Sequence, residues 1–197
     1  MVLNLIVLGI KLLLKNYCQK IKIIRIELLF KNNKFRGHIE KLLIEAEDII
    51  YKGIYLNHIK IKGFNLNINL SKTYRLLKFK DFEAETTLYL TNENLKNIIN
   101  KNCSKIIYEI KEFALQNLSV RHISFDNQLI NFDIFNEEKS YKFIYDLNFE
   151  NNNLILKDIN SKKYLLIPFD LNINFKSLSF EKDYLEVKLK SIVKLEN

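Results

Sequence analysis

Few residues of this chain have the types and spacing that chemistry requires. The two cysteines, Cys18 and Cys103, are far apart and belong to no CxxC or Cys/His motif, so we expect a reduced compartment and no disulfide framework. His38, His58 and His122 also stand apart, without the HxH or HxxxH spacing of metal ligands. The sequence therefore predicts neither a metal site nor a bound cofactor.

The nearest approach to an acid–base pair is a cluster of carboxylates at Glu45, Glu47 and Asp48. Such residues more often form the wet face of an amphipathic segment. No G-x-S-x-G motif, P-loop or G-x-G-x-x-G fingerprint is present. Because no nucleophile, base and orienting group can be assembled, we expect a protein that is not an enzyme.

The composition is that of a globular domain with a basic excess. The 197 residues are 48% apolar and 27% charged, and the net charge is +8. An anionic partner would explain this charge, and so would A/T-rich coding that places lysine on solvated faces. Only four of the 31 basic residues are arginine, and basic and aromatic residues do not alternate, so nucleic acid is not the expected partner.

The N-terminal segment, residues 2–15, is apolar nearly all round. Helical spacing predicts a helix over about residues 3–20. The face expected toward the domain is Leu3, Ile6, Val7, Ile10, Leu14 and Tyr17, and the opposite face has Val2, Leu5, Leu8 and Leu12. The segment is too short for a membrane span and contains Lys11, and it lacks the flanks of a signal peptide. The second apolar face needs a cover from protein, a bilayer surface or a bound lipid.

Residues 21–30 are β-branched with interspersed charges, which predicts a strand. Residues 39–50 are ambiguous, because Ile39, Leu42, Leu43, Ala46, Ile49 and Ile50 fit an amphipathic helix that ends near Gly53. Beyond Gly63 strict alternation predicts a strand, and residues 82–90 alternate again. Thr91 is a good N-cap for a helix over 92–101, and a second helix is expected over 104–116.

The last third has short strands separated by Asn- and Asp-rich turns, and Pro168 marks an edge or a bulge. The expected fold is one α+β domain over residues 1–197. It has an N-terminal helix (1–20), long strands (21–90), helices (91–117) and an antiparallel meander (118–197).

Two stretches resemble a known family: "RIELLFKNNKFRGHIEKLLIEAEDIIYKGIYLNHIKIKGFNLNINL" and "FEAETTLYLTNENLKNII". Together they are similar to the LmeA-like phospholipid-binding family, whose members look like half-modules of the tubular lipid-binding (TULIP) superfamily. The matching positions are Gly37, Ile39, Leu42, Ile44, Ala46, Tyr51, Gly53, Ile54, Leu56, Ile59, Ile61, Gly63, Leu66, Ile68, Leu90, Thr91 and Leu95. The resemblance covers roughly residues 5–100 and rests on glycine and apolar spacing; beyond them only strand order matches.

This resemblance favours strands over a helix for residues 39–50. It implies that Gly37 starts a long strand, that Gly53 lies at the hairpin or bulge after it, and that Gly63 kinks the next strand. A bulge near Asp48 would then shift the register. The implied architecture is a long N-terminal helix packed against a strongly curved antiparallel sheet, with an apolar channel between them.

The channel implied by this fold would take acyl chains, since each buried methylene contributes about 0.8 kcal/mol. Its expected lining is Ile6, Ile10, Leu42, Ile44, Ala46, Ile59, Ile61, Leu66, Ile68, Leu88 and Leu90. We therefore expect non-catalytic binding of a phospholipid or another acyl lipid by a cytoplasmic protein at the periphery of an anionic membrane. Further copies of the chain, in a homo-oligomer, are among the candidate partners. The alternatives are a scaffold protein with a closed core and, less in keeping with the sequence, a basic nucleic-acid-binding protein.

Overall fold

The structure is a computed structural model that describes residues 2–30, 37–51, 54–70, 77–79, 81–101, 112, 119–126, 128–135, 139–151, 153–168 and 173–193. Its elements, in chain order, are α1 (Val2–Tyr17), β1 (Ile23–Leu29), β2 (His38–Tyr51), β3 (Ile54–Leu70), β4 (Leu77–Phe79), β5 (Phe82–Thr91), α2 (Asn92–Lys101), β6 (Ser119–Asp126), β7 (Leu129–Phe135), β8 (Ser140–Glu150), β9 (Asn153–Asp158), β10 (Tyr164–Pro168), β11 (Ile173–Phe180) and β12 (Tyr184–Val193).

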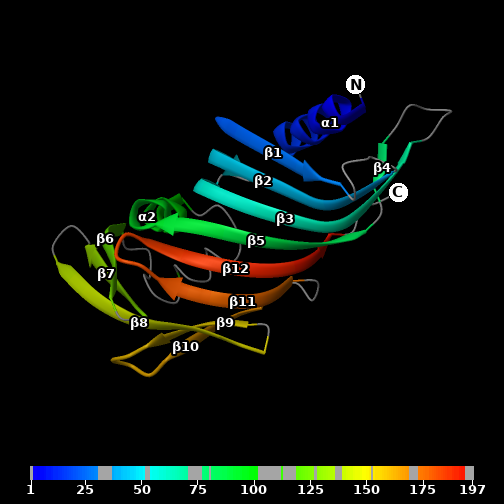
Figure 1. Ribbon diagram of the computed structural model, residues 1–197. Coiled ribbons are helices and arrows are strands. Elements are labelled where there is room, and N and C mark those ends of the chain that lie inside the picture. Colours follow the sequence, from blue (N-terminus) through cyan, green and yellow to red (C-terminus); the bar gives the residue numbers. More distant parts are fainter. Residues whose placement is uncertain are drawn as a thin grey trace.

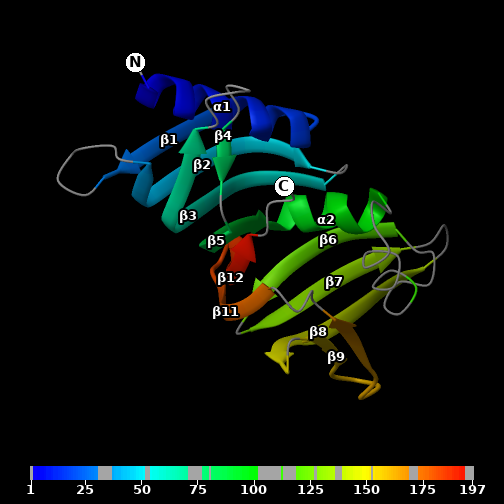
Figure 2. The same ribbon diagram turned by 90° about the vertical axis from the view of Figure 1, so that its right-hand side faces the viewer.

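The strands form two antiparallel sheets (Figure 1). The large sheet has the order β1–β2–β3–β5–β12–β11, with β4 paired to β3. The small sheet has the order β10–β9–β8–β7–β6. In Figure 2, α1 lies over β1 to β3, whereas α2 and the small sheet lie toward the other end of the large sheet.

The predicted α+β class, with one long helix packed along a single curved sheet, is wrong. Strands contain 70% of the described residues and helices only 17%. The N-terminal helix has 16 residues, and a second sheet covers the part of the large sheet that it does not reach. Alternation identifies strands but not their partners, so the sequence pattern does not distinguish two sheets from one.

The ambiguous segment before Gly53 is a strand, as the family resemblance favoured. Its residues pair with β3 from His38↔Asn67 to Tyr51↔Ile54, so a 14-residue strand replaces the helical alternative. Gly37 precedes β2 and has a φ of 81°, a conformation that favours glycine. Gly53 lies outside the described residues.

Gly63 lies inside β3, and the kink that the resemblance implied there stays a prediction. A Cβ at this position would lie 3.1 Å from a side-chain atom of Leu66 and 3.1 Å from the ring of Phe82. Glycine therefore lets these two side chains pack directly on the backbone of β3.

The predicted irregularity at Asp48 is present, but the register shift is not. Asp48 has a φ of 51°, and the buried side chains of β2 change phase there, from Ala46 to Ile49. The pairing partners nevertheless continue in register on both sides, from Glu47↔His58 to Ile49↔Leu56. The strand therefore reverses the face that it buries without slipping against its neighbour.

Two buried clusters stabilise the fold. In the first, Ile6 and Ile10 of α1 pack against Ile39, Leu42 and Ile44 of β2. The second lies between the small sheet, α2 and the far end of the large sheet, and it is centred on side chains such as Ile123, Phe132 and Ile134. The predicted burial of one face of the N-terminal helix is thus confirmed for Ile6 and Ile10, whereas Leu3 and Tyr17 are exposed.

The predicted C-terminal meander holds for β6 to β10 only. These five strands pair in sequence order, and Pro168 ends the edge strand β10, where its missing N–H removes no bond inside the sheet. β11 and β12 leave the meander and join the large sheet, where β12 pairs with β5 from Tyr184↔Thr91 to Val193↔Phe82. The helix over 92–101 is confirmed as α2, and residues 104–116 lie outside what is described, apart from Glu112.

Candidate functional site

An apolar cavity of about 200 Å³ lies between the two sheets. None of the side chains that line it is polar. They come from α2, from three strands of the large sheet and from three strands of the small sheet. The lining is Leu88, Leu90, Leu95, Ile98, Ile99, Ile130, Phe132, Leu147, Leu154, Leu156, Phe175, Leu178, Leu185, Val187 and Leu189.

The alternation of side chains along the strands explains which residues of the large sheet line the cavity. Leu88 pairs with Val187, which pairs with Leu178, so these three residues form a row across β5, β12 and β11. The same row continues through Ile59 to Ala46 at the α1 end of the sheet. Because paired residues point to the same face, α1 and the small sheet cover one common face of the large sheet.

Aromatic pairs join the two sheets on either side of the cavity. Phe125 of β6 meets Phe180 of β11 edge to face, with ring centroids 5.9 Å apart. Phe149 of β8 stacks on Phe175 of β11, with centroids 3.9 Å apart and an interplanar angle of 16°. These contacts fix the separation of the sheets, and Phe175 is itself part of the cavity wall.

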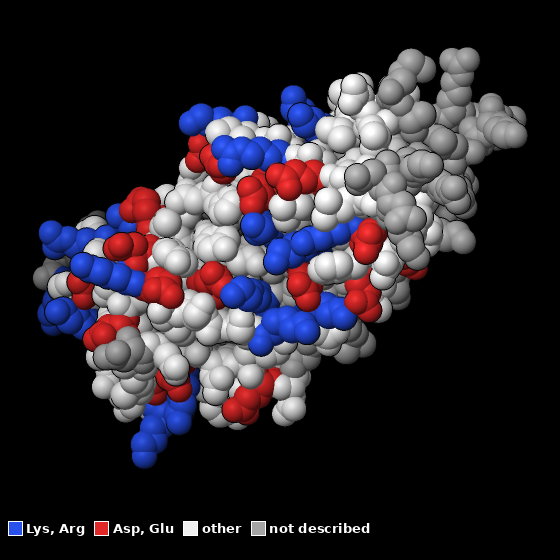
Figure 3. Space-filling model, viewed as in Figure 1, with Lys and Arg blue, Asp and Glu red and all other residues white. Residues whose placement is uncertain are grey.

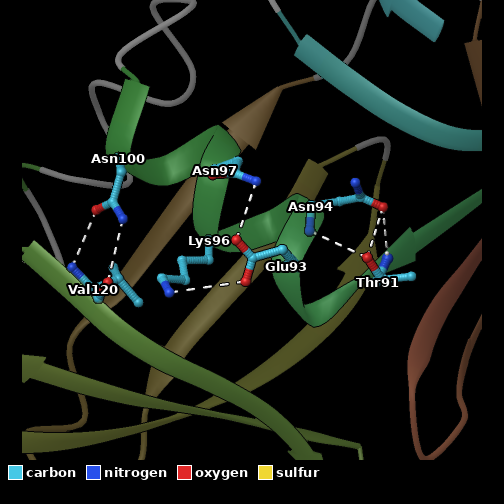
Figure 4. Close-up of polar contacts among 7 residues, drawn as sticks. All are labelled: Thr91, Glu93, Asn94, Lys96, Asn97, Asn100 and Val120. Carbon is cyan, nitrogen blue, oxygen red and sulfur yellow. Dashed lines mark hydrogen bonds and ion pairs between the residues drawn. The ribbon is translucent and has the colours of Figure 1, made fainter. Parts of the chain in front are cut away.

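Asparagine side chains hold α2 at the side of the cavity (Figure 4). Thr91 is the predicted N-cap, and its Oγ1 accepts a hydrogen bond from the Asn94 backbone N–H at 3.2 Å. The side chain of Asn94, fully buried, accepts from the Thr91 backbone N–H at 3.1 Å and donates to Asn57 Oδ1 on β3 at 3.3 Å. This reciprocal cap satisfies the orphan donors of the helix start and ties it to the large sheet.

The other end of α2 is tied to the small sheet. Asn100 Nδ2 donates to the Val120 carbonyl at 3.2 Å, and the Val120 N–H donates to Asn100 Oδ1 at 3.1 Å. The side-chain amide thus pairs with the edge of β6 as a neighbouring strand would, which satisfies edge groups that are otherwise open. Helix α2 therefore links the two sheets and presents Leu95, Ile98 and Ile99 to the cavity between them.

The structure separates the predicted channel residues into groups. Leu88 and Leu90 line the cavity. Ile6, Ile10, Leu42, Ile44 and Leu66 lie in the cluster around α1, with Ile61 packed against it. Ala46 is buried and Ile59 partly buried in the row that leads to the cavity, and the side chain of Ile68 lies outside what is described. The residues of α2, β7, β8 and β9 were not expected, because sequence periodicity does not show which sheets pack together.

The opposite face of the large sheet carries paired charges (Figure 3). Lys60 Nζ lies 2.7 Å from Glu45 Oε1, and this hydrogen bond lowers the pKa of Glu45 and raises that of Lys60. Lys190 Nζ lies 2.7 Å from Glu83 Oε2. Further pairs are Lys22–Asp48, Arg25–Glu47 and Lys188–Glu186. A face on which lysine and arginine side chains repeatedly pair with carboxylates is a poor surface for a nucleic-acid backbone.

Helix α1 carries an exposed apolar stripe on the side away from the sheet. Leu5, Leu8 and Leu12 are 55%, 52% and 53% exposed, and we call these three residues the leucine stripe. Their spacing puts them on one face of the helix, opposite Ile6 and Ile10. No helix in the described part of the chain is long and apolar enough to cross a bilayer.

A second hollow, about 360 Å³, lies on the outer face of the small sheet. It combines Asp146, Glu150 and Lys157 with the exposed Tyr164 and Leu166. Its lining has no single chemical character. Among the described residues, no group of three or more His, Cys, Asp and Glu side chains lies close enough together to hold a metal ion.

Comparison with protein-family models, with curated proteins and with solved structures finds no match for this chain. The resemblance to the LmeA-like family therefore stays a prediction, and the cavity must be interpreted from its own chemistry.

Proposed function

We propose that this protein binds the hydrocarbon part of an acyl lipid, without catalysis, in the cavity between the two sheets, and that it takes up this lipid at an anionic membrane surface. The observation that carries the proposal is the wholly apolar lining of the cavity. Hydrocarbon is the ligand chemistry that such a wall favours, since water would find no hydrogen-bonding partners in it.

The size of the cavity supports the same proposal. An apolar cavity of roughly 150 Å³ stays dry and binds a molecule such as benzene, and this one has about 200 Å³. A hydrocarbon chain in this space would contribute about 0.8 kcal/mol for each buried methylene.

The leucine stripe supports the proposed membrane contact. An amphipathic helix lies in the membrane interface when its apolar side is open and basic residues accompany it. Helix α1 contains Lys11 and Lys15 and no acidic residue, so its charge is complementary to an anionic surface. The buried face of α1 stays on the large sheet, which leaves the leucine stripe for the bilayer.

A scaffold role is the second candidate. The leucine stripe that favours a membrane would equally serve as an interface with another protein, and such a protein would need no ligand in the cavity. The two functions differ in whether binding depends on the cavity.

Uptake of a fluorescent fatty acid from vesicles tests the proposal. Val187→Phe adds four carbon atoms at the centre of the cavity floor, so we expect it to reduce uptake by at least tenfold. Thr87→Phe is the matched control, because Thr87 lies on the neighbouring strand and points to the opposite face. Equal uptake by both variants would contradict binding in the cavity, and no uptake by the unchanged protein would favour the scaffold role.

A further inference from the structure

The volume of the cavity limits the length of chain that it can take. Benzene, with six carbon atoms, fits a cavity of roughly 150 Å³. By proportion, a cavity of about 200 Å³ has room for about eight carbon atoms. Neither the two chains of a phospholipid nor one full-length chain would be enclosed in such a space.

Phe175 forms a fixed part of the cavity wall. Its ring stacks on Phe149 of the opposite sheet with centroids 3.9 Å apart, and Phe149 itself does not line the cavity. A ring held between the cavity and a second ring cannot turn aside easily to admit a longer chain.

A bulge in β11 brings Phe175 to this position. Phe175 pairs with Leu189 and Ser177 pairs with Lys188, so the register shifts between Phe175 and Ser177. Without the bulge, Phe175 and Leu178 would point to opposite faces, because they are three residues apart. With the extra residue, both line the cavity, and bulges are often found where a strand must turn a side chain toward a site.

We propose that the cavity encloses a single straight acyl chain of about eight carbon atoms and that Phe175 determines this length. This inference rests on the acyl-lipid binding proposed above. It narrows the ligand to a medium-chain acyl group, or to the end of a longer chain whose remainder stays outside the cavity.

Dissociation constants for straight-chain carboxylates, from butanoate to hexadecanoate, test the proposal on the full-length protein. Each methylene that enters the cavity should tighten binding about fourfold. We expect this gain up to about eight carbon atoms and no further gain beyond them.

Two variants test the role of Phe175. Phe175→Leu has three fewer side-chain carbon atoms, so the limit should move to a chain longer by about three carbon atoms. Phe180→Leu is the matched control, because Phe180 packs between the same two sheets against Phe125 but does not line the cavity. Its limit should stay at the original length.

The outcomes test acyl-lipid binding, the limit on chain length and the role of Phe175 separately. If none of the carboxylates binds, acyl-lipid binding itself is refuted. If they bind but the affinity continues to rise steadily to hexadecanoate, only the length limit is refuted. A length limit that is unchanged in Phe175→Leu, or that moves equally in Phe180→Leu, would refute the role of Phe175.

Discussion

Leu88→Phe adds three carbon atoms to the wall of the cavity, and its effect distinguishes an open cavity from a closed core. Leu88 lies in the row with Val187 and Leu178, so a larger side chain there projects into a space of about 200 Å³. Three added carbon atoms, at about 0.8 kcal/mol each, give an upper limit of about 2 kcal/mol of added stability. We expect the ligand-free variant to be as stable as the parent protein or more stable, up to this limit.

Ile44→Phe is the matched comparison, because it adds the same three carbon atoms on the same face of the large sheet. Ile44 is only 6% exposed and lies in the close-packed cluster with Ile6 and Ile10 of α1. Overpacking there should cost about 1–3 kcal/mol. Urea-induced unfolding of both variants, without ligand, measures the difference. If Leu88→Phe loses as much stability as Ile44→Phe, the cavity has no room for added hydrocarbon, and an open cavity between the sheets is refuted.

Three further predictions concern the start of α2, the leucine stripe and the carboxylate of Asp158. Thr91→Ala removes the N-cap of α2 and should lower the free energy of unfolding by about 0.5–2 kcal/mol in urea titration, with Thr87→Ala as the control. Replacing Leu8 with serine at the centre of the leucine stripe should weaken co-sedimentation with anionic vesicles at least tenfold. The free energy of unfolding should stay unchanged, because Leu8 is exposed. Unaltered sedimentation would exclude the stripe from membrane contact. Burial raises the pKa of Asp158, but hydrogen bonds from Ser161 Oγ at 2.6 Å and from the Asn160 N–H outweigh it and lower that pKa overall. The resulting stabilisation is present above the ordinary pKa of about 3.9 and is lost as the pH falls below it. On acidification, the free energy of unfolding should therefore fall more for the parent protein than for Asp158→Asn.

Local patterns in the sequence predicted the elements that depend on neighbouring residues. Thr91 starts α2 because its side chain caps the next turn, and Gly37 precedes β2 because its backbone has a positive φ. Residues 39–50 alone were ambiguous, since the phase change at Asp48 imitates helical spacing. Pairing with β3 resolves that ambiguity in favour of a strand.

Contacts between distant parts of the chain were beyond the reach of these patterns. Leu88 and Leu90 were expected to line a channel because the family resemblance implied one, but the opposite wall of the cavity belongs to a separate sheet. Strand β12 pairs with β5, although α2 and six strands lie between them in the chain, and no local signal specifies this pairing. The bulge that turns Phe175 inward depends on Leu189 and Lys188 of the partner strand, so it too was not visible in the sequence.

Native mass spectrometry of gently purified protein, before and after the addition of octanoate, tests acyl-chain binding most directly. We expect one acyl ligand per chain, displaced or excluded in Val187→Phe and retained in Thr87→Phe. A protein that carries no lipid, takes up no octanoate and shows no rise in its thermal midpoint when octanoate is added would contradict it.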